Sequence, residues 1–119
     1  EVHLADLAEN DRSSIMTHVA YSGLIAFGAP TMNNQMYPAM ADALCYIKGL
    51  RPKNKIGFAF GSCGWSGEGA KQISAELEAM GVEQPEKFIQ VKYMPNAEEL
   101  TAIRDAGKRL AENLLEKCK

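Results

Sequence analysis

Residues 60–68 read Phe60-Gly61-Ser62-Cys63-Gly64-Trp65-Ser66-Gly67-Glu68 and separate two different hydrophobic patterns. The preceding run, Ile56-Gly57-Phe58-Ala59-Phe60, is continuously apolar, as expected of a strand covered on both faces. Apolar residues then recur at helical spacing, at Ala70, Ile73, Leu77 and Met80. The stretch is therefore predicted to be a loop between a buried strand and a helix that returns over the sheet.

A second loop of the same kind lies earlier in the chain, at Gly28-Ala29-Pro30-Thr31-Met32-Asn33-Asn34. It follows the apolar run Leu24-Ile25-Ala26-Phe27, and a helical pattern with Pro38 in its first turn comes after it. Both loops are expected at the carboxyl edge of one parallel sheet. That edge is where open α/β sheets bind ligands.

Two further strands and helices complete the pattern. Val2–Leu7 is predicted to be a strand, and Asn10 or Asp11 is predicted to cap the helix after it. The alternating residues around Val91 form the last strand, and a helix follows Pro95-Asn96. Four strands and four helices in strict alternation favour a doubly wound parallel sheet in a three-layer α/β/α arrangement. We expect residues 1–119 to form one domain.

A receiver domain has a similar alternation of strands and helices. It needs an aspartate directly after the strand Leu24–Phe27, and this chain has Gly28-Ala29-Pro30 there. That alternative is therefore set aside.

Composition excludes several classes of partner. The chain has 46% hydrophobic and 24% charged residues and a formal net charge of -2, so it lacks the basic surface that nucleic acid or an anionic membrane attracts. No apolar run approaches the roughly 20 residues of a membrane span. The cysteines number three, without Cys-x-x-Cys spacing, which fits a reducing cytoplasm. His3 and His18 have no acidic or cysteine neighbours at metal-ligand spacing.

The side chains of the two loops suit a flat aromatic ligand with polar edges. The loop around Trp65 offers glycines that let backbone N–H groups approach closely, two hydroxyls and the only tryptophan. The earlier loop has a Pro-Thr turn and two asparagine amides. Neither loop clusters an acid and a base for proton transfer. The alternative is a tight strand-to-helix turn in which Trp65 covers the core.

Three motifs resemble the flavodoxin-like domain of flavodiiron proteins, the A-type flavoproteins that include rubredoxin:oxygen oxidoreductases. They are residues 28–34, Tyr46-Ile47-Lys48-Gly49-Leu50-Arg51-Pro52, and residues 60–67. The similarity covers nearly the whole chain and implies FMN as the ligand. The positions that the resemblance assigns to FMN are Pro30, Thr31, Met32, Asn33, Asn34, Ser62, Cys63, Gly64, Trp65, Ser66 and Gly67. Trp65 is expected to stack against the isoalloxazine ring.

This sequence departs from the family at three points. Cys63 replaces a common aromatic residue, and Ala29 replaces a common serine. The family's first strand, its hydroxyl-rich phosphate loop and its first helix have no counterpart before Val2. The flavodoxin order 2-1-3-4-5 leaves a vacant strand position between Val2–Leu7 and Leu24–Phe27. We therefore expect this chain to be a partial domain with weakened FMN binding.

The resemblance implies an electron relay in a cytoplasmic oxidoreductase. FMN would accept electrons from rubredoxin or a flavin reductase and pass them to a diiron centre in a metallo-β-lactamase-like domain, usually of the neighbouring subunit in a homo-oligomer, where O₂ or NO is reduced. This chain has no His/Asp/Glu cluster for two irons. The alternatives are a non-catalytic binding or oligomerisation module without FMN, and a stand-alone FMN-dependent quinone reductase or nitroreductase.

Overall fold

The computed structural model describes residues 1–32, 35–64 and 67–117. Helices and strands follow one another along the chain as α1 (Arg12–Tyr21), β1 (Leu24–Met32), β2 (Gln35–Met36), α2 (Pro38–Gly49), β3 (Ile56–Cys63), α3 (Glu68–Ala79), β4 (Ile89–Lys92) and α4 (Ala97–Lys117).

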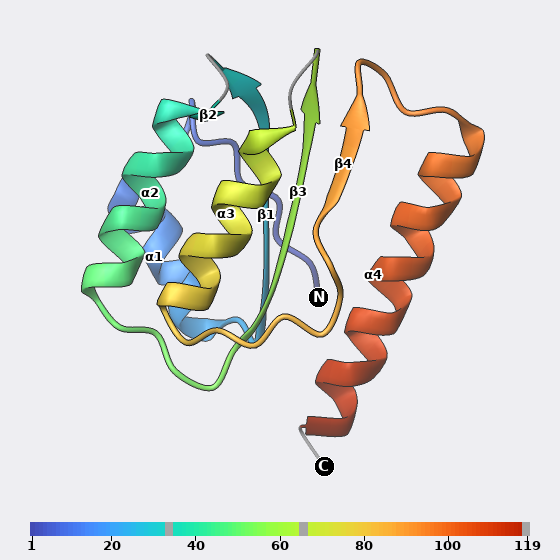
Figure 1. Cartoon of the computed structure of the whole chain (residues 1–119). Coiled ribbons are helices and arrows are strands. Elements are labelled where there is room, and N and C mark those ends of the chain that lie inside the picture. Colours follow the sequence, from blue (N-terminus) through green and yellow to red (C-terminus); the bar gives the residue numbers. More distant parts are fainter. Residues whose placement is uncertain (33–34, 65–66, 118–119) are drawn as a thin grey trace.

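The strands form one sheet in the order β2-β1-β3-β4 (Figure 1). β1, β3 and β4 run parallel, as predicted, with Ala29, Gly61 and Gln90 side by side across them. The short β2 was not predicted, and it pairs antiparallel with the end of β1, so the sheet is mixed. A hydrogen bond of 2.7 Å from the Met36 backbone N–H to the Gln72 side chain also ties β2 to α3.

Helices cover both faces of the sheet, which confirms the doubly wound α/β fold. On one face, α1, α2 and α3 pack against Phe27 and Ala59 through a core that includes Ile15, Val19, Met40, Leu44, Ile47, Ile73 and Leu77. On the other face, α4 covers Phe58 with Ala106 and Leu110. Figure 1 shows α4 set apart from the other three helices.

The helix ends follow their local sequence. The Asp11 side chain accepts a hydrogen bond of 2.8 Å from the Ser14 backbone N–H and caps α1 as predicted. At the start of α4, Asn96 and Glu99 cap each other reciprocally. Gly81 adopts a φ of 78° after α3, a left-handed conformation that glycine tolerates.

The prediction of a strand at Val2–Leu7 is wrong. Residues 1–6 have no regular structure, and the chain turns after Asp6. The Asp6 side chain accepts a hydrogen bond from the Ala8 backbone N–H, and its carbonyl accepts from those of Glu9 and Asn10. Local bonds of this kind compete with strand pairing. Leu4 remains fully exposed.

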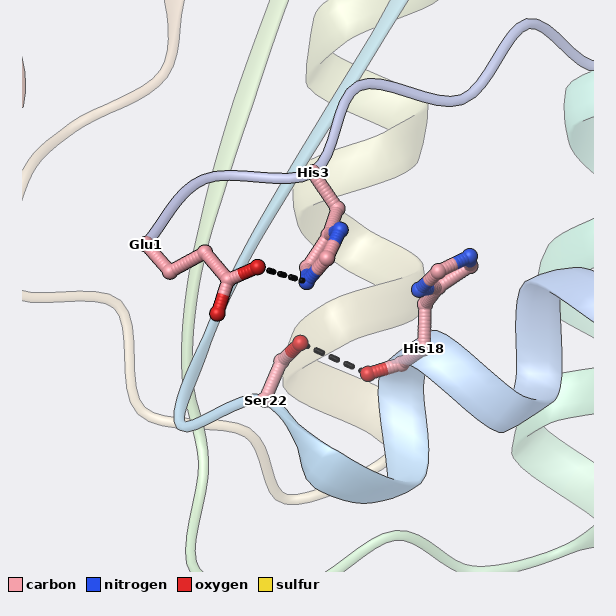
Figure 2. A network of polar contacts seen from close by, with 4 residues as sticks. All are labelled: Glu1, His3, His18 and Ser22. Carbon is pink, nitrogen blue, oxygen red and sulfur yellow. Dashed lines mark hydrogen bonds and ion pairs between the residues drawn. The ribbon is translucent and has the colours of Figure 1, made fainter.

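The first residues lie beside α1 instead of beside β1 in the sheet. The rings of His3 and His18 lie with their centroids 4.8 Å apart and their planes tilted by 35°, and Glu1 Oε1 lies 3.5 Å from His3 Nε2 (Figure 2). Within the described residues, the edge of β1 that faces away from β3 is paired only at Thr31 and Met32. Val2–Leu7 therefore does not pair with Leu24–Phe27.

None of the helices within residues 1–32, 35–64 and 67–117 combines the length and the apolar character that a membrane crossing requires.

Candidate functional site

The two predicted ligand loops lie next to each other at the carboxyl edge of the sheet. Their predicted bounds are wrong at the start, because β1 continues through Gly28–Met32 and β3 through Phe60–Cys63. Pro30 of β1 pairs with Ser62 of β3, so the strands enter their loops in register. Pro30, Thr31, Met32, Ser62, Cys63, Gly64 and Gly67 are the candidate residues that the structure describes. Asn33, Asn34, Trp65 and Ser66 lie outside the described residues, and their roles remain predictions.

The exposed part of this edge is formed by apolar side chains and backbone. Pro30 and Met32 on the first loop and Gly64 and Gly67 on the second are exposed, whereas Ser62 and Cys63 are partly buried. The Cys63 thiol lies 3.6 Å from the Val91 carbonyl oxygen. Gly64 and Gly67 have no side chain to cover their exposed backbone, and their contact with a ligand stays a prediction.

The Thr31 side chain makes hydrogen bonds within the protein, which the sequence did not predict. Its hydroxyl oxygen accepts a hydrogen bond of 3.1 Å from the backbone N–H of Gly69, at the start of α3. It accepts a second, of 3.3 Å, from Nε2 of Gln90. A Cβ atom on Gly69 would lie 2.7 Å from this hydroxyl, so the glycine permits the close approach. The hydroxyl thus connects β1, α3 and β4.

Gln90 was missed by sequence reasoning, although a signal was present. It is a polar residue between two apolar ones in β4, and its position in the sheet points it toward the α3 face. Its Oε1 atom is buried and has no hydrogen-bond partner among the residues that the structure describes. Buried polar atoms are rarely left unpaired, so this oxygen is an acceptor that a ligand or a water molecule could satisfy.

Tyr93, just beyond β4, is a second residue near the site that the sequence did not predict. Its backbone N–H donates a hydrogen bond of 2.8 Å to the Cys63 carbonyl oxygen, and its ring lies beside Gly64. The side chain is 72% exposed, and the residue has a φ of 59°, which is unfavourable for an aromatic residue. Strained backbone of this kind tends to occur at functional sites.

The described part of the chain contains no cluster of metal-binding side chains. His3 and His18 contact each other through tilted rings, and with the nearby Glu1 they form no set of ligands for a metal ion (Figure 2). Within residues 1–32, 35–64 and 67–117, no three His, Cys, Asp or Glu side chains are placed to hold an ion.

The architecture defines a class: an open α/β sheet with helices on both faces is the arrangement of a doubly wound α/β domain. The comparison with family models gives the family. The flavodoxin model matches residues 1–107, and the chain belongs to the flavodoxin family.

Its relatives are flavodiiron-type proteins, which confirms the resemblance seen in the sequence. The chain is 41% identical over 102 residues to rubredoxin-oxygen oxidoreductase of Megalodesulfovibrio gigas, covering 86% of this chain and 25% of that protein. It is 33% identical over 115 residues to nitric oxide reductase of Moorella thermoacetica, covering 96% of this chain and 29% of that protein. The chain thus spans about a quarter of the length of these curated relatives.

Solved structures agree with this assignment. Rubredoxin oxygen:oxidoreductase from Desulfovibrio gigas superposes with a TM-score of 0.92 at 38% identity, over 94% of this chain and 28% of that one. The flavodiiron protein from Giardia intestinalis gives 0.88 at 34% identity, again over 94% and 28%. An archaeal flavodoxin gives 0.80 at 25% identity, over 91% of this chain and 73% of the flavodoxin. The chain is therefore a flavodoxin-like module of the flavodiiron type.

Proposed function

We propose that this chain binds FMN at the carboxyl edge of β1 and β3 and acts as the electron relay of a flavodiiron-type oxidoreductase. The donor is rubredoxin or a flavin reductase. The acceptor is a diiron site on a metallo-β-lactamase-like domain of the neighbouring subunit in a homo-oligomer, where O₂ or NO is reduced. The family of oxidoreductases to which the chain is similar supports this proposal.

The described residues fit a flavin ring. The observation that carries the proposal is the side-by-side placement of the two loops, with exposed Gly64 and Gly67 on one and Pro30 and Met32 on the other. Gln90, which donates a hydrogen bond to Thr31, adds a buried Oε1 acceptor that has no partner among the described residues. A planar ring with an apolar face and polar edges matches this combination of groups.

The residues of the site bind and orient the cofactor. Backbone groups from Ser62 to Gly67 and from Thr31 to Asn34 hydrogen-bond the polar edge of the ring, and Trp65 stacks on its face. Met32 and Pro30 exclude water from the other side. FMN, when bound, supplies a ring that takes up electrons and releases them one at a time, and fixed dipoles around it set its potential.

Flavin content tests the proposal directly. The purified full-length protein is expected to show flavin absorbance, or to acquire it when FMN is added, and bound flavin is expected to be reduced rapidly by reduced rubredoxin or by a flavin reductase. A colourless protein that takes up no FMN would contradict the proposal and favour a non-catalytic module. Fast steady-state turnover of a quinone with NAD(P)H would instead favour a stand-alone quinone reductase.

A further inference from the structure

We propose that Gln90 is a positioning residue that holds the two ligand loops together so that a flavin ring fits between them. This role rests on the proposed function and adds to it a residue on a third strand, outside both loops. Four observations carry it: the register of the sheet, the hydrogen bond to Thr31, the packing against Gly67 and an amide oxygen that has no partner among the described residues.

The register places Gln90 where it can reach across β3. Gln90 pairs with Gly61, and Gly61 pairs with Ala29, so the three residues form a row that ends two residues before Thr31, on the same face of β1. Gly61 has no side chain to block the path. The Gln90 amide therefore extends to the end of β1, where Nε2 donates its hydrogen bond of 3.3 Å to the Thr31 hydroxyl.

The same side chain also contacts the end of the second loop. A Cβ atom on Gly67 would lie 3.4 Å from both Cγ and Cδ of Gln90, so the glutamine packs directly against this glycine. The Thr31 hydroxyl meanwhile accepts from Gly69 in α3. One amide thus connects β4, the end of β1 and the segment that leads from the second loop into α3. Groups fixed before a ligand arrives bind it at a lower entropic cost.

Stability alone does not account for a glutamine at this position. Its buried Oε1 lacks a partner among the described residues, and an unpaired buried oxygen destabilises the folded state. An apolar side chain of similar size at this position would avoid the cost of burying an unpaired oxygen. The neighbours of Gln90 in β4, Ile89 and Val91, are apolar. The choice of an amide is explained if it orders the loops for a ligand.

The test compares Gln90→Leu with Gln84→Leu in the full-length protein. Gln84 is a matched control because it is also partly buried, and both of its amide atoms are bonded to Ser74, at 2.7 and 3.0 Å. It lies near the opposite edge of the sheet, where Glu83 pairs with Ile56 at the start of β3. The readouts are thermal unfolding of the apoprotein, the dissociation constant for FMN and the midpoint potential of the bound flavin.

Gln90→Leu is expected to leave the apoprotein Tm unchanged or raised, to weaken FMN binding about tenfold and to shift the midpoint potential. Gln84→Leu is expected to lower Tm and to leave affinity and potential at the wild-type values. Wild-type affinity and potential in Gln90→Leu would overturn the inference while leaving FMN binding intact. An equal loss of affinity in both variants would also overturn it, because the effect would then be general destabilisation. If the wild type takes up no FMN, the proposed function fails and this role falls with it.

A double-mutant cycle with Thr31→Val tests whether Gln90 acts through Thr31. The valine keeps the shape of the threonine and removes the hydroxyl that Gln90 contacts. If the two side chains work as a unit, the double variant loses less FMN affinity than the product of the two single losses. Full additivity would overturn the inferred coupling.

Discussion

The carbonyl oxygen of Ala29 occupies the space that a Cβ atom on Gly61 would need. The two residues face each other across β1 and β3, immediately before the ligand loops. We predict that Gly61→Ala lowers the free energy of unfolding by about 2–3 kcal/mol, because a backbone atom must move to admit the methyl group. Urea unfolding measures the loss.

Gly28→Ala is the control for this prediction. A Cβ atom there would overlap one side of the Phe60 ring and no backbone atom nearer than that ring, and Phe60 is 40% exposed. That ring can swing outward, so we expect a cost of about 1 kcal/mol or less. Equal losses of unfolding free energy in the two variants would contradict the expected extra cost of the clash with the Ala29 backbone.

Replacing Tyr93 by glycine is expected to stabilise the fold. The residue has a φ of 59°, and its exposed ring contributes little packing. Glycine adopts that conformation without steric strain, so Tyr93→Gly should raise the free energy of unfolding by about 1 kcal/mol. Tyr93→Ala, which loses the ring and keeps the strain, serves as the comparison. A glycine variant no more stable than the alanine variant would refute the role of strain.

The cysteines report on ligand binding at the candidate site. Cys45 is exposed on α2, whereas Cys63 is partly buried at the carboxyl edge of β3. We predict that a thiol reagent modifies Cys45 faster than Cys63, and that added FMN slows the modification of Cys63 alone. Mass spectrometry of a Cys118→Ser background follows both sites separately. Protection of neither cysteine, with FMN demonstrably bound, would place the flavin elsewhere.

Acid should weaken the start of α1. Hydrogen bonds from Ser14 lower the pKa of Asp11 below its usual value of 3.8. A carboxylate with a depressed pKa in the folded state stabilises that state above its unfolded pKa, and the contribution is lost as the pH falls through the folded pKa. We therefore predict a small loss of Tm below about pH 4 that is absent in Asp11→Asn, since asparagine caps the helix without titrating. Identical pH profiles for the two proteins would argue against this cap.

Much of the fold could be predicted because its signals are local. A strand segment covered by helices on both faces is apolar, and this pattern identifies β1 and β3. Asp11 and Pro38 mark the starts of α1 and α2, and Gly81 marks the end of α3. The same patterns place both ligand loops at one edge of the sheet. That prediction required only the parallel order of the strands.

Other features could not be predicted from hydrophobic periodicity. Val2–Leu7 has the composition of a strand, but local hydrogen bonds to Asp6 turn the chain instead. The roles of Gln90 and Thr31 were hidden for a different reason, because 59 positions separate them in the sequence. Periodicity records which face of an element is apolar. Only the register of β1, β3 and β4 determines which side chains meet, since a shift of one residue would turn Gln90 to the opposite face.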